Sequence, residues 1–183
     1  MKYFIASDIH GSYYYGKMVV DKFIASKSDK LILLGDILYH GPRNDLPVDY
    51  NPKELTKLLN QYKKDIICVQ GNCDADVDQM VLQFPILAPY FIMEVNDINV
   101  YFTHGHKFNN DNLPPLNNED ILIHGHTHVQ RKEFYPTHTY LNPGSISLPK
   151  EDSYHGYMIL ENDSFYWYDE NDVCHDSLKV GKD

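Results

Sequence analysis

The chain has 183 residues, of which 43% are hydrophobic and 23% are charged, and its formal net charge is −10. This length predicts a single domain spanning residues 1–183, large enough to bury a sizeable core. The negative charge argues against an extended nucleic-acid surface, which needs clustered lysine and arginine. It does not exclude a phosphate substrate, because metal ions in an acidic protein can attract one phosphate locally.

The N-terminal residues and the cysteines favour a cytoplasmic protein. Asp8 stands too early for the apolar region of a secretory signal. No apolar run approaches the roughly 20 residues that cross a bilayer, so we expect no membrane partner. The three cysteines, Cys68, Cys73 and Cys174, match no zinc-ribbon or redox spacing and suit a reducing compartment. The oligomeric state stays open, with a homo-oligomer as one option.

The first seventy residues predict alternating strands and helices. Short runs rich in Ile, Leu and Val at residues 3–7, 30–34 and 66–70 each fit a strand buried on both faces. Ser12 can cap a helix after the first run, and Asn51-Pro52-Lys53-Glu54 is a start signal for a second helix. This β-α-β-α-β order implies parallel strands with right-handed crossovers.

The second half of the chain predicts a different sheet. Asp74 is expected to cap a short helical stretch at residues 76–82. Beyond it, short runs of apolar and aromatic residues alternate with turn residues. The predicted strands are residues 90–95, 99–103, 121–124, 132–135, 138–141, 154–160 and 164–168. We expect these strands to form a mostly antiparallel second sheet stacked on the first.

Two long irregular segments separate some of these elements. Residues 37–51 and 106–120 are both rich in Asn, Asp and Pro. Long irregular loops within a compact domain are often functional. Both segments are therefore candidates to frame a substrate.

Five short motifs place possible metal ligands at or near the ends of predicted strands. They are Asp8-Ile9-His10, Gly35-Asp36, Gly71-Asn72, His104-Gly105-His106 and Gly125-His126-Thr127-His128. Any one of them could be an ordinary turn or cap. Ligands of a βα sheet gather at the carboxyl ends of its strands, so the five together predict one site.

The donor set of these motifs indicates two divalent metal ions. Seven side chains supply oxygen or nitrogen: Asp8, His10, Asp36, Asn72, His104, His126 and His128. Mixed carboxylate and imidazole ligands suit Mn, Fe or Zn better than Mg or Ca. Two ions about 3.5–4 Å apart share a carboxylate. Asp36 is the natural bridge, because the tight turn at Gly35 lets its short side chain lie between them.

These motifs resemble the pattern DxH, GD, GN, H and GHxH of the calcineurin-like metallophosphoesterase superfamily. Three longer segments resemble its YfcE-type phosphodiesterase branch. They are residues 35–44, Gly71-Asn72-Cys73-Asp74 and Leu141-Asn142-Pro143-Gly144-Ser145. The resemblance implies an α/β fold, a four-layer αββα sandwich of two mixed sheets. It also implies a two-metal enzyme with manganese as the expected metal and Zn, Fe or Ni as alternatives.

The resemblance also implies a division of the ligands. One metal would take Asp8, His10, Asp36 and His128. The other would take Asp36, Asn72, His104 and His126. Asp36, Asn72 and His104 are thereby expected in the catalytic machinery as well as in the metal site.

The expected activity is hydrolysis of a small phosphodiester by a hydroxide that bridges two metal ions. Two such ions lower the pKa of a bridging water and neutralise charge that develops on the phosphoryl oxygens. No nucleophilic side chain is then required, and the sequence has neither a P-loop nor a GxSxG motif. One alternative is a phosphomonoesterase or nucleotidase on the same site. Another is a non-catalytic scaffold, as in the retromer subunit that resembles this fold, although all seven ligand positions here carry competent residues.

Three further residues have open roles. Cys73 stands where many superfamily members have a histidine that can protonate the leaving group, and a thiol is a weaker acid catalyst at neutral pH. Arg43 lies in a Gly-Pro-Arg-Asn turn and could bind phosphate or simply be solvated. His106 could support the site or be an ordinary loop histidine.

Overall fold

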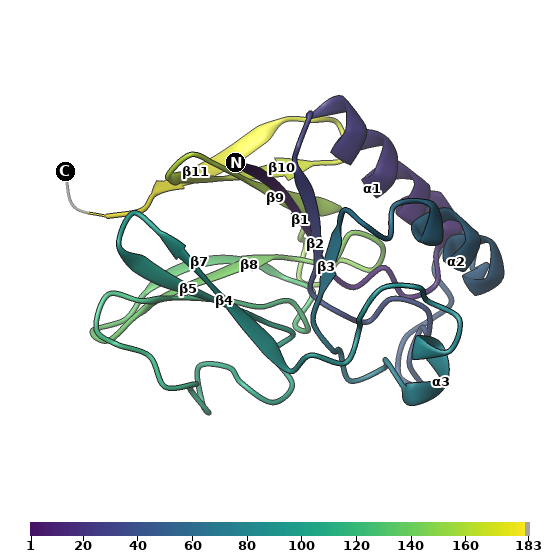
Figure 1. The fold of residues 1–183 in the computed structure, drawn as a ribbon, viewed down its shortest axis with the longest axis horizontal. Coiled ribbons are helices and arrows are strands. Elements are labelled where there is room, and N and C mark those ends of the chain that lie inside the picture. Colours follow the sequence, from purple (N-terminus) through teal and green to yellow (C-terminus); the bar gives the residue numbers. More distant parts are fainter. Residues whose placement is uncertain (182–183) are drawn as a thin grey trace.

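Two mixed β-sheets packed face to face form the body of the structure (Figure 1), a computed structural model in which residues 1–181 are described. The six-stranded sheet has the order β11-β10-β9-β1-β2-β3, and the five-stranded sheet has the order β4-β5-β6-β8-β7. The strands of the first sheet are β1 Lys2–Ala6, β2 Lys30–Leu33, β3 Ile66–Cys68, β9 Gly156–Glu161, β10 Ser164–Asp169 and β11 Cys174–Lys179. Those of the second are β4 Tyr90–Val95, β5 Ile98–Thr103, β6 Ile121–Ile123, β7 Gln130–Phe134 and β8 Thr139–Pro143.

The helices begin where the sequence predicts. Helix α1, Tyr13–Ala25, begins after Ser12, whose hydroxyl accepts a hydrogen bond from the Tyr15 amide at 3.2 Å. Helix α2, Pro52–Gln61, begins after Asn51, whose side chain accepts from the Glu54 amide at 3.3 Å. Both helices pack against the six-stranded sheet, and their apolar side chains belong to the same buried cluster as alternate residues of β1 and β2.

The alternation of side chains in β1 and β2 explains why these strands are apolar at successive positions after the lysine that begins each one. Phe4 of β1 and Leu31 of β2 face the helices, whereas Ile5 and Ile32 face the five-stranded sheet. A strand covered on both faces needs apolar residues on both. The Trp167 indole on β10 also donates to the Asn142 carbonyl on β8 at 2.9 Å, which joins the two sheets.

The expected sandwich of two mixed sheets is confirmed, and the two outer layers differ. Helices α1 and α2 cover the six-stranded sheet (Figure 1). Over the five-stranded sheet, part of the outer layer is loop 104–120, which contacts β5 and β4. The Tyr101 hydroxyl donates to the Pro115 carbonyl at 2.9 Å, and the Tyr90 ring meets Phe108 edge-on.

The prediction of a mostly antiparallel second sheet is wrong in two respects. Strands β9 and β10 join the first sheet, where β9 pairs antiparallel with β1. Five consecutive residues of β9 are buried, so it needs a position covered on both faces, and the edge of β1 provides one. The second sheet itself is mixed, because β6 pairs parallel with both β5 and β8. Strand β11 was not predicted from the sequence, because its mostly exposed polar residues carry little strand signal.

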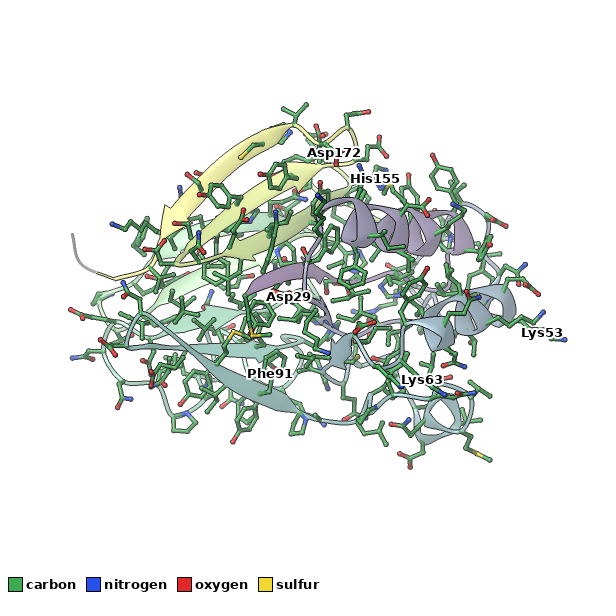
Figure 2. The ribbon with its side chains drawn as sticks, turned by 45° about the horizontal axis from the view of Figure 1, so that its top comes forward. Asp29, Lys53, Lys63, Phe91, His155 and Asp172 are labelled. Carbon is green, nitrogen blue, oxygen red and sulfur yellow. The ribbon has the colours of Figure 1, made fainter. Side chains whose placement is uncertain are left out.

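Helix α1 is fastened to the C-terminal strands by polar contacts. The Lys22 amine lies 2.5 Å from a carboxylate oxygen of Asp172, and the Tyr15 hydroxyl lies 3.0 Å from Nε2 of His155. Figure 2 shows Asp172 and His155 near α1. None of the helices in residues 1–181 combines the length and apolar character that crossing a bilayer requires.

The expected role of Asp74 as a helix cap is wrong. Helix α3, Asp76–Gln79, has Ala75 at its cap position. The buried Asp74 carboxylate instead accepts three backbone hydrogen bonds, from Asp36 at 2.8 Å, Ile37 at 2.9 Å and Gly71 at 2.7 Å. Asp74 therefore ties the loop after β2 to the loop after β3.

We expect Asp74→Ala to lower the free energy of unfolding by about 3 kcal/mol or more, because three backbone N–H groups lose a charged acceptor. Urea denaturation of the two proteins measures this difference. Asp76→Ala is the matched control: it removes an exposed carboxylate two residues away and should change stability by no more than about 0.5 kcal/mol. Equal losses in the two variants would contradict the structural role of Asp74.

Candidate metal centre

The seven predicted ligand residues meet at one end of the sandwich. Asp8 and His10 follow β1, Asp36 follows β2, and Asn72 follows β3, all in the six-stranded sheet. The five-stranded sheet contributes His104 after β5 and both His126 and His128 after β6. The centre is therefore built by both sheets, and its dimensions depend on how they pack.

One half of the cluster surrounds Asp8. Its Oδ1 lies 3.3 Å from Nε2 of His128 and 3.5 Å from Nε2 of His10. The two Nε2 atoms lie 3.2 Å apart. Burial opposes ionisation of Asp8, but the close approach of the His10 and His128 imidazoles holds the pKa of its carboxyl well below the usual value.

The other half of the cluster surrounds His104. Its Nε2 lies 2.9 Å from Oδ1 of Asn72 and 3.2 Å from Nδ1 of His126. The residues that carry these three atoms follow β3, β5 and β6, and the atoms lie close together. Burial, together with nearby His104, lowers the pKa of His126 and so favours its neutral, ligand-competent form.

Asp36 lies between the two halves. Its Oδ2 is 3.7 Å from Nε2 of His10 and 3.5 Å from Nε2 of His104. Its Oδ1 accepts the Cys73 backbone N–H at 2.8 Å, which sets the orientation of the carboxylate. One and the same oxygen of Asp36 therefore lies near an imidazole of each half of the cluster.

The hydrogen bonds on the far side of the rings test whether a cation fits. Nδ1 of His10 lies 2.8 Å from the Tyr39 carbonyl, Nδ1 of His104 lies 2.7 Å from that of Leu34, and Nδ1 of His128 lies 2.6 Å from that of Leu148. A carbonyl only accepts, so each Nδ1 carries a proton, and the neutral form of each ring then presents an Nε2 lone pair to the cluster.

These lone pairs face other acceptors. Within residues 1–181, Oδ1 of Asp8 is buried and has no hydrogen-bond donor. Lone pairs and carboxylate oxygens crowded at 2.9–3.7 Å repel one another unless a cation lies among them. The residues present therefore fit divalent metal ions.

The backbone at these positions is unusual. Asp8, His10, Asp36, His126 and His128 all have φ between 52° and 65°, a region that non-glycine residues seldom adopt. Such conformations persist where surrounding structure enforces them, and they concentrate at functional sites. Gly71 shows how close the packing is, because a Cβ there would lie 2.1 Å from Oδ1 of Asp36.

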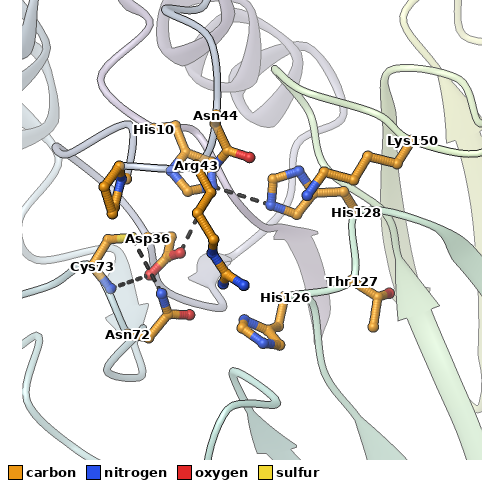
Figure 3. A pocket seen from close by; sticks show the side chains of 12 residues that line it. His10, Asp36, Arg43, Asn44, Asn72, Cys73, His126, Thr127, His128 and Lys150 are labelled. Carbon is orange, nitrogen blue, oxygen red and sulfur yellow. Dashed lines mark hydrogen bonds and ion pairs between the residues drawn. The ribbon is translucent and has the colours of Figure 1, made fainter.

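A cavity of about 470 Å³ opens over the cluster (Figure 3). Two residues with open roles, Cys73 and Arg43, line it beside His10, Asp36 and Asn72. The Cys73 sulfur lies within 4.8 Å of a potential ligand atom of His10 and of one of Asp36, so Cys73 lies directly beside the cluster.

The cavity also has lining residues that the sequence analysis missed. Thr127, Asn44 and Lys150 contribute to its wall. Thr127 and Asn44 lie within or beside predicted motifs, but Lys150 follows a segment that carried no signal for the site. Its approach to the cavity depends on the loop after β8.

Cys73 and His106 differ in their relation to the cavity. Burial and the nearby Asp36 carboxylate raise the pKa of the Cys73 thiol, so it stays protonated at neutral pH. The His106 ring lies beside His104 and His126, with centroids 5.4 and 6.4 Å away, but His106 is not part of the cavity wall. Burial and neighbouring His104 lower the pKa of His106 to about 4, so its ring is neutral.

Comparison with known proteins defines the class. Residues 1–164 match the calcineurin-like phosphoesterase superfamily domain, and the chain belongs to this family. The chain is 44% identical over 167 residues to phosphodiesterase YfcE of Escherichia coli strain K12, covering 89% of each chain. The solved structure of YfcE, described as a phosphoesterase, superposes with a TM-score of 0.94 at 40% identity, over 99% of this chain and 100% of that one.

A more distant likeness shows the fold alone. Wild-type Vps29 of Entamoeba histolytica, solved in complex with Zn²⁺, has a TM-score of 0.63 at 18% identity over 99% of this chain and 100% of that one. The fold is thus shared by proteins of quite different sequence, and the arrangement of side chains at the site has to carry any argument about chemistry.

We expect the unmodified protein to bind two metal ions per chain and the Asp36→Asn protein to bind at most one. The substitution removes the negative charge that allows two cations to lie close together. Turnover of a phosphodiester should fall by more than about 100-fold. Elemental analysis after dialysis measures the metal content directly.

His106→Ala is the control for this experiment. The side chain lies next to the cluster and outside the expected ligand set, so its removal should leave metal content near normal. Two tightly bound ions in the Asp36→Asn protein would contradict the bridging assignment.

Proposed function

We propose that this protein hydrolyses small phosphodiesters with two divalent metal ions. The observation that carries the proposal is the position of Asp36, whose Oδ2 lies within 3.7 Å of an imidazole nitrogen from each half of the cluster. Membership of the phosphoesterase family and 44% identity to a named phosphodiesterase support the same activity.

We assign the metal ligands as the sequence pattern suggests. Asp8, His10, Asp36 and His128 would hold one ion, and Asp36, Asn72, His104 and His126 the other. Two ions bound there would supply a hydroxide nucleophile near neutral pH and neutralise charge on the phosphoryl group. Mn²⁺ is the metal we propose first, with Zn, Fe and Ni as alternatives, because the donors mix imidazole with carboxylate.

The protein's own residues orient this centre. The carbonyl groups of Tyr39, Leu34 and Leu148 accept hydrogen bonds from Nδ1 of three imidazoles. These contacts orient the rings so that each Nε2 can coordinate a metal ion. Outer hydrogen bonds of this kind set ring orientation and raise ligand basicity. The Cys73 backbone N–H holds the other Asp36 oxygen, so Asp36 can turn only one oxygen toward both halves.

Within residues 1–181, the site lacks an efficient proton donor for the leaving group. Cys73 lines the cavity at the position where a histidine acid is expected, and its raised pKa leaves the thiol a poor proton donor at neutral pH. We therefore propose that the enzyme favours esters whose leaving groups depart without protonation.

Two other functions are compatible with this fold. A phosphomonoesterase would use the same ligands, and only substrate profiling separates it from a diesterase. A non-catalytic scaffold is consistent with the fold but needs no complete ligand set, whereas all seven donors converge here. A cytoplasmic location is proposed from the free cysteines Cys68, Cys73 and Cys174, which form no disulfide within the described chain.

We expect bis(4-nitrophenyl) phosphate to be hydrolysed with a kcat/KM at least about tenfold above that of 4-nitrophenyl phosphate. The diester brings one negative charge fewer to the metals, and the open cavity of about 470 Å³ has room for a second ester group. Initial rates with Mn²⁺, and again after chelation, measure both the preference and the metal requirement. A higher kcat/KM for the monoester would favour the phosphatase alternative.

The rate should also depend steeply on the pKa of the leaving group, because Cys73 donates a proton poorly. Cys73→His should accelerate alkyl esters by about 10²–10⁴-fold and nitrophenyl esters much less, as general acid catalysis acts mainly on poor leaving groups. The measurement is the slope of log kcat/KM against leaving-group pKa in both proteins. Metal content of the variant is checked first. Equal slopes would show that Cys73 is not at the acid position or that another residue supplies the proton.

A further inference from the structure

Two basic side chains line the cavity over the metal centre. Arg43 comes from the loop after β2, and Lys150 comes from the loop after β8. Figure 3 shows both beside the cluster, with the Arg43 guanidinium directed toward the space between Asp36 and His126. Lys150 extends from the side of His128. The cavity is therefore flanked by two positive charges in addition to any metal ions.

The charged groups of Arg43 and Lys150 have no hydrogen-bond or ion-pair partner within residues 1–181. Several other basic side chains do have acidic partners: Lys22 lies 2.5 Å from Asp172, Lys132 lies 2.5 Å from Asp176, and Arg131 lies 3.0 Å from Glu151. The two cavity cations remain available to a ligand.

Hydrogen bonds fix the position of the loop that carries Arg43 relative to the candidate metal centre. The ring of His10 donates to the Tyr39 carbonyl at 2.8 Å, four residues before Arg43. The Asn44 side chain donates to the His40 carbonyl at 2.8 Å and closes the turn around Arg43. Gly41 faces Cys73, where an added Cβ would lie 3.2 Å from the sulfur.

The loop that carries Lys150 is held in the same way by a different ligand. The ring of His128 donates to the Leu148 carbonyl at 2.6 Å. The Lys150 amide in turn donates to the His128 carbonyl at 3.1 Å. Each basic residue thus lies in a loop that is hydrogen-bonded to an imidazole of the half of the cluster around Asp8. The positions of both cations are set relative to that half of the centre.

We propose that Arg43 and Lys150 bind a second phosphate, carried by one ester group of the phosphodiester substrate. This inference rests on the proposed function, in which the metals bind the scissile phosphate. A guanidinium can bind a phosphate through two parallel hydrogen bonds, and a lysine adds a point charge. A cavity of about 470 Å³ accommodates a ligand of nucleotide size. The substrate class is a phosphodiester with a further terminal phosphate on its non-leaving side.

Two matched esters test this proposal. Thymidine 5′-(4-nitrophenyl phosphate) and the same compound with a 3′-phosphate share the scissile bond and the leaving group. The 3′-phosphorylated ester should have a kcat/KM about tenfold higher, since exposed ion pairs contribute up to about fivefold each. This advantage should shrink as salt is raised, because the cations are exposed.

Substitutions of Arg43 and Lys150 test whether these residues cause the higher kcat/KM of the 3′-phosphorylated ester. Arg43→Gln and Lys150→Gln should each reduce the ratio between the two esters by about threefold to fivefold, and the double variant should bring it near one. Lys53→Gln is the matched control, because it removes the same charge from an exposed residue at the start of α2 that does not line the cavity. A ratio near one in the unmodified protein, or a ratio that survives the double variant, would overturn the proposal.

Binding provides a readout that does not depend on turnover. In the Mn²⁺-loaded protein, thymidine 3′,5′-bisphosphate should bind about tenfold more tightly than thymidine 5′-monophosphate, and the double variant should lose this difference. If the protein hydrolyses neither ester, the proposed function is refuted. The ratio of the affinities for the two nucleotides would still test the second-phosphate site. Hydrolysis of both esters at equal rates, with equal binding of the two nucleotides, would leave the function standing and refute this inference.

Discussion

The structure depends on two buried carboxylates that share a small space with imidazole rings. Asp8 is 0% exposed and Asp36 is 2% exposed, and both are surrounded by hydrogen-bonded groups. The His126 backbone N–H donates to Asp8 at 3.0 Å, and the Cys73 backbone N–H donates to Asp36 at 2.8 Å. Buried charges are costly unless they are paired or coordinate metals, so the surrounding backbone and the proposed cations are parts of one arrangement.

This arrangement joins the two sheets. Asp8 and Asp36 follow strands of the six-stranded sheet, whereas His104 and His128 follow strands of the five-stranded sheet. The apolar layer between the sheets, which includes Ile5, Ile32, Phe102, Leu141 and Trp167, therefore sets the distances between donors. Close-packed interiors deform little, so a well-packed layer of this kind can keep the donor atoms in position.

The same imidazoles organise the walls of the cavity. Rings that turn one nitrogen toward the cluster use the other to hold the carbonyl groups of Tyr39 and Leu148. Those carbonyls lie in the loops that present Arg43 and Lys150. The proposed metal binding and the proposed substrate selection would therefore be linked through the backbone, because the same rings take part in both.

The sequence by itself predicted the seven donors, because each motif is local and lies close to the end of an apolar strand. It also predicted helices α1 and α2 through their caps, Ser12 and Asn51. Only the tertiary structure decided the long-range features. These are the pairing of β9 with β1, the three backbone bonds of Asp74, and the approach of Lys150 to the cavity. Apart from the Gly71–Asp74 hydrogen bond, the partners in these contacts are far apart in the chain, so local patterns carry no information about them, and only the tertiary fold brings them together.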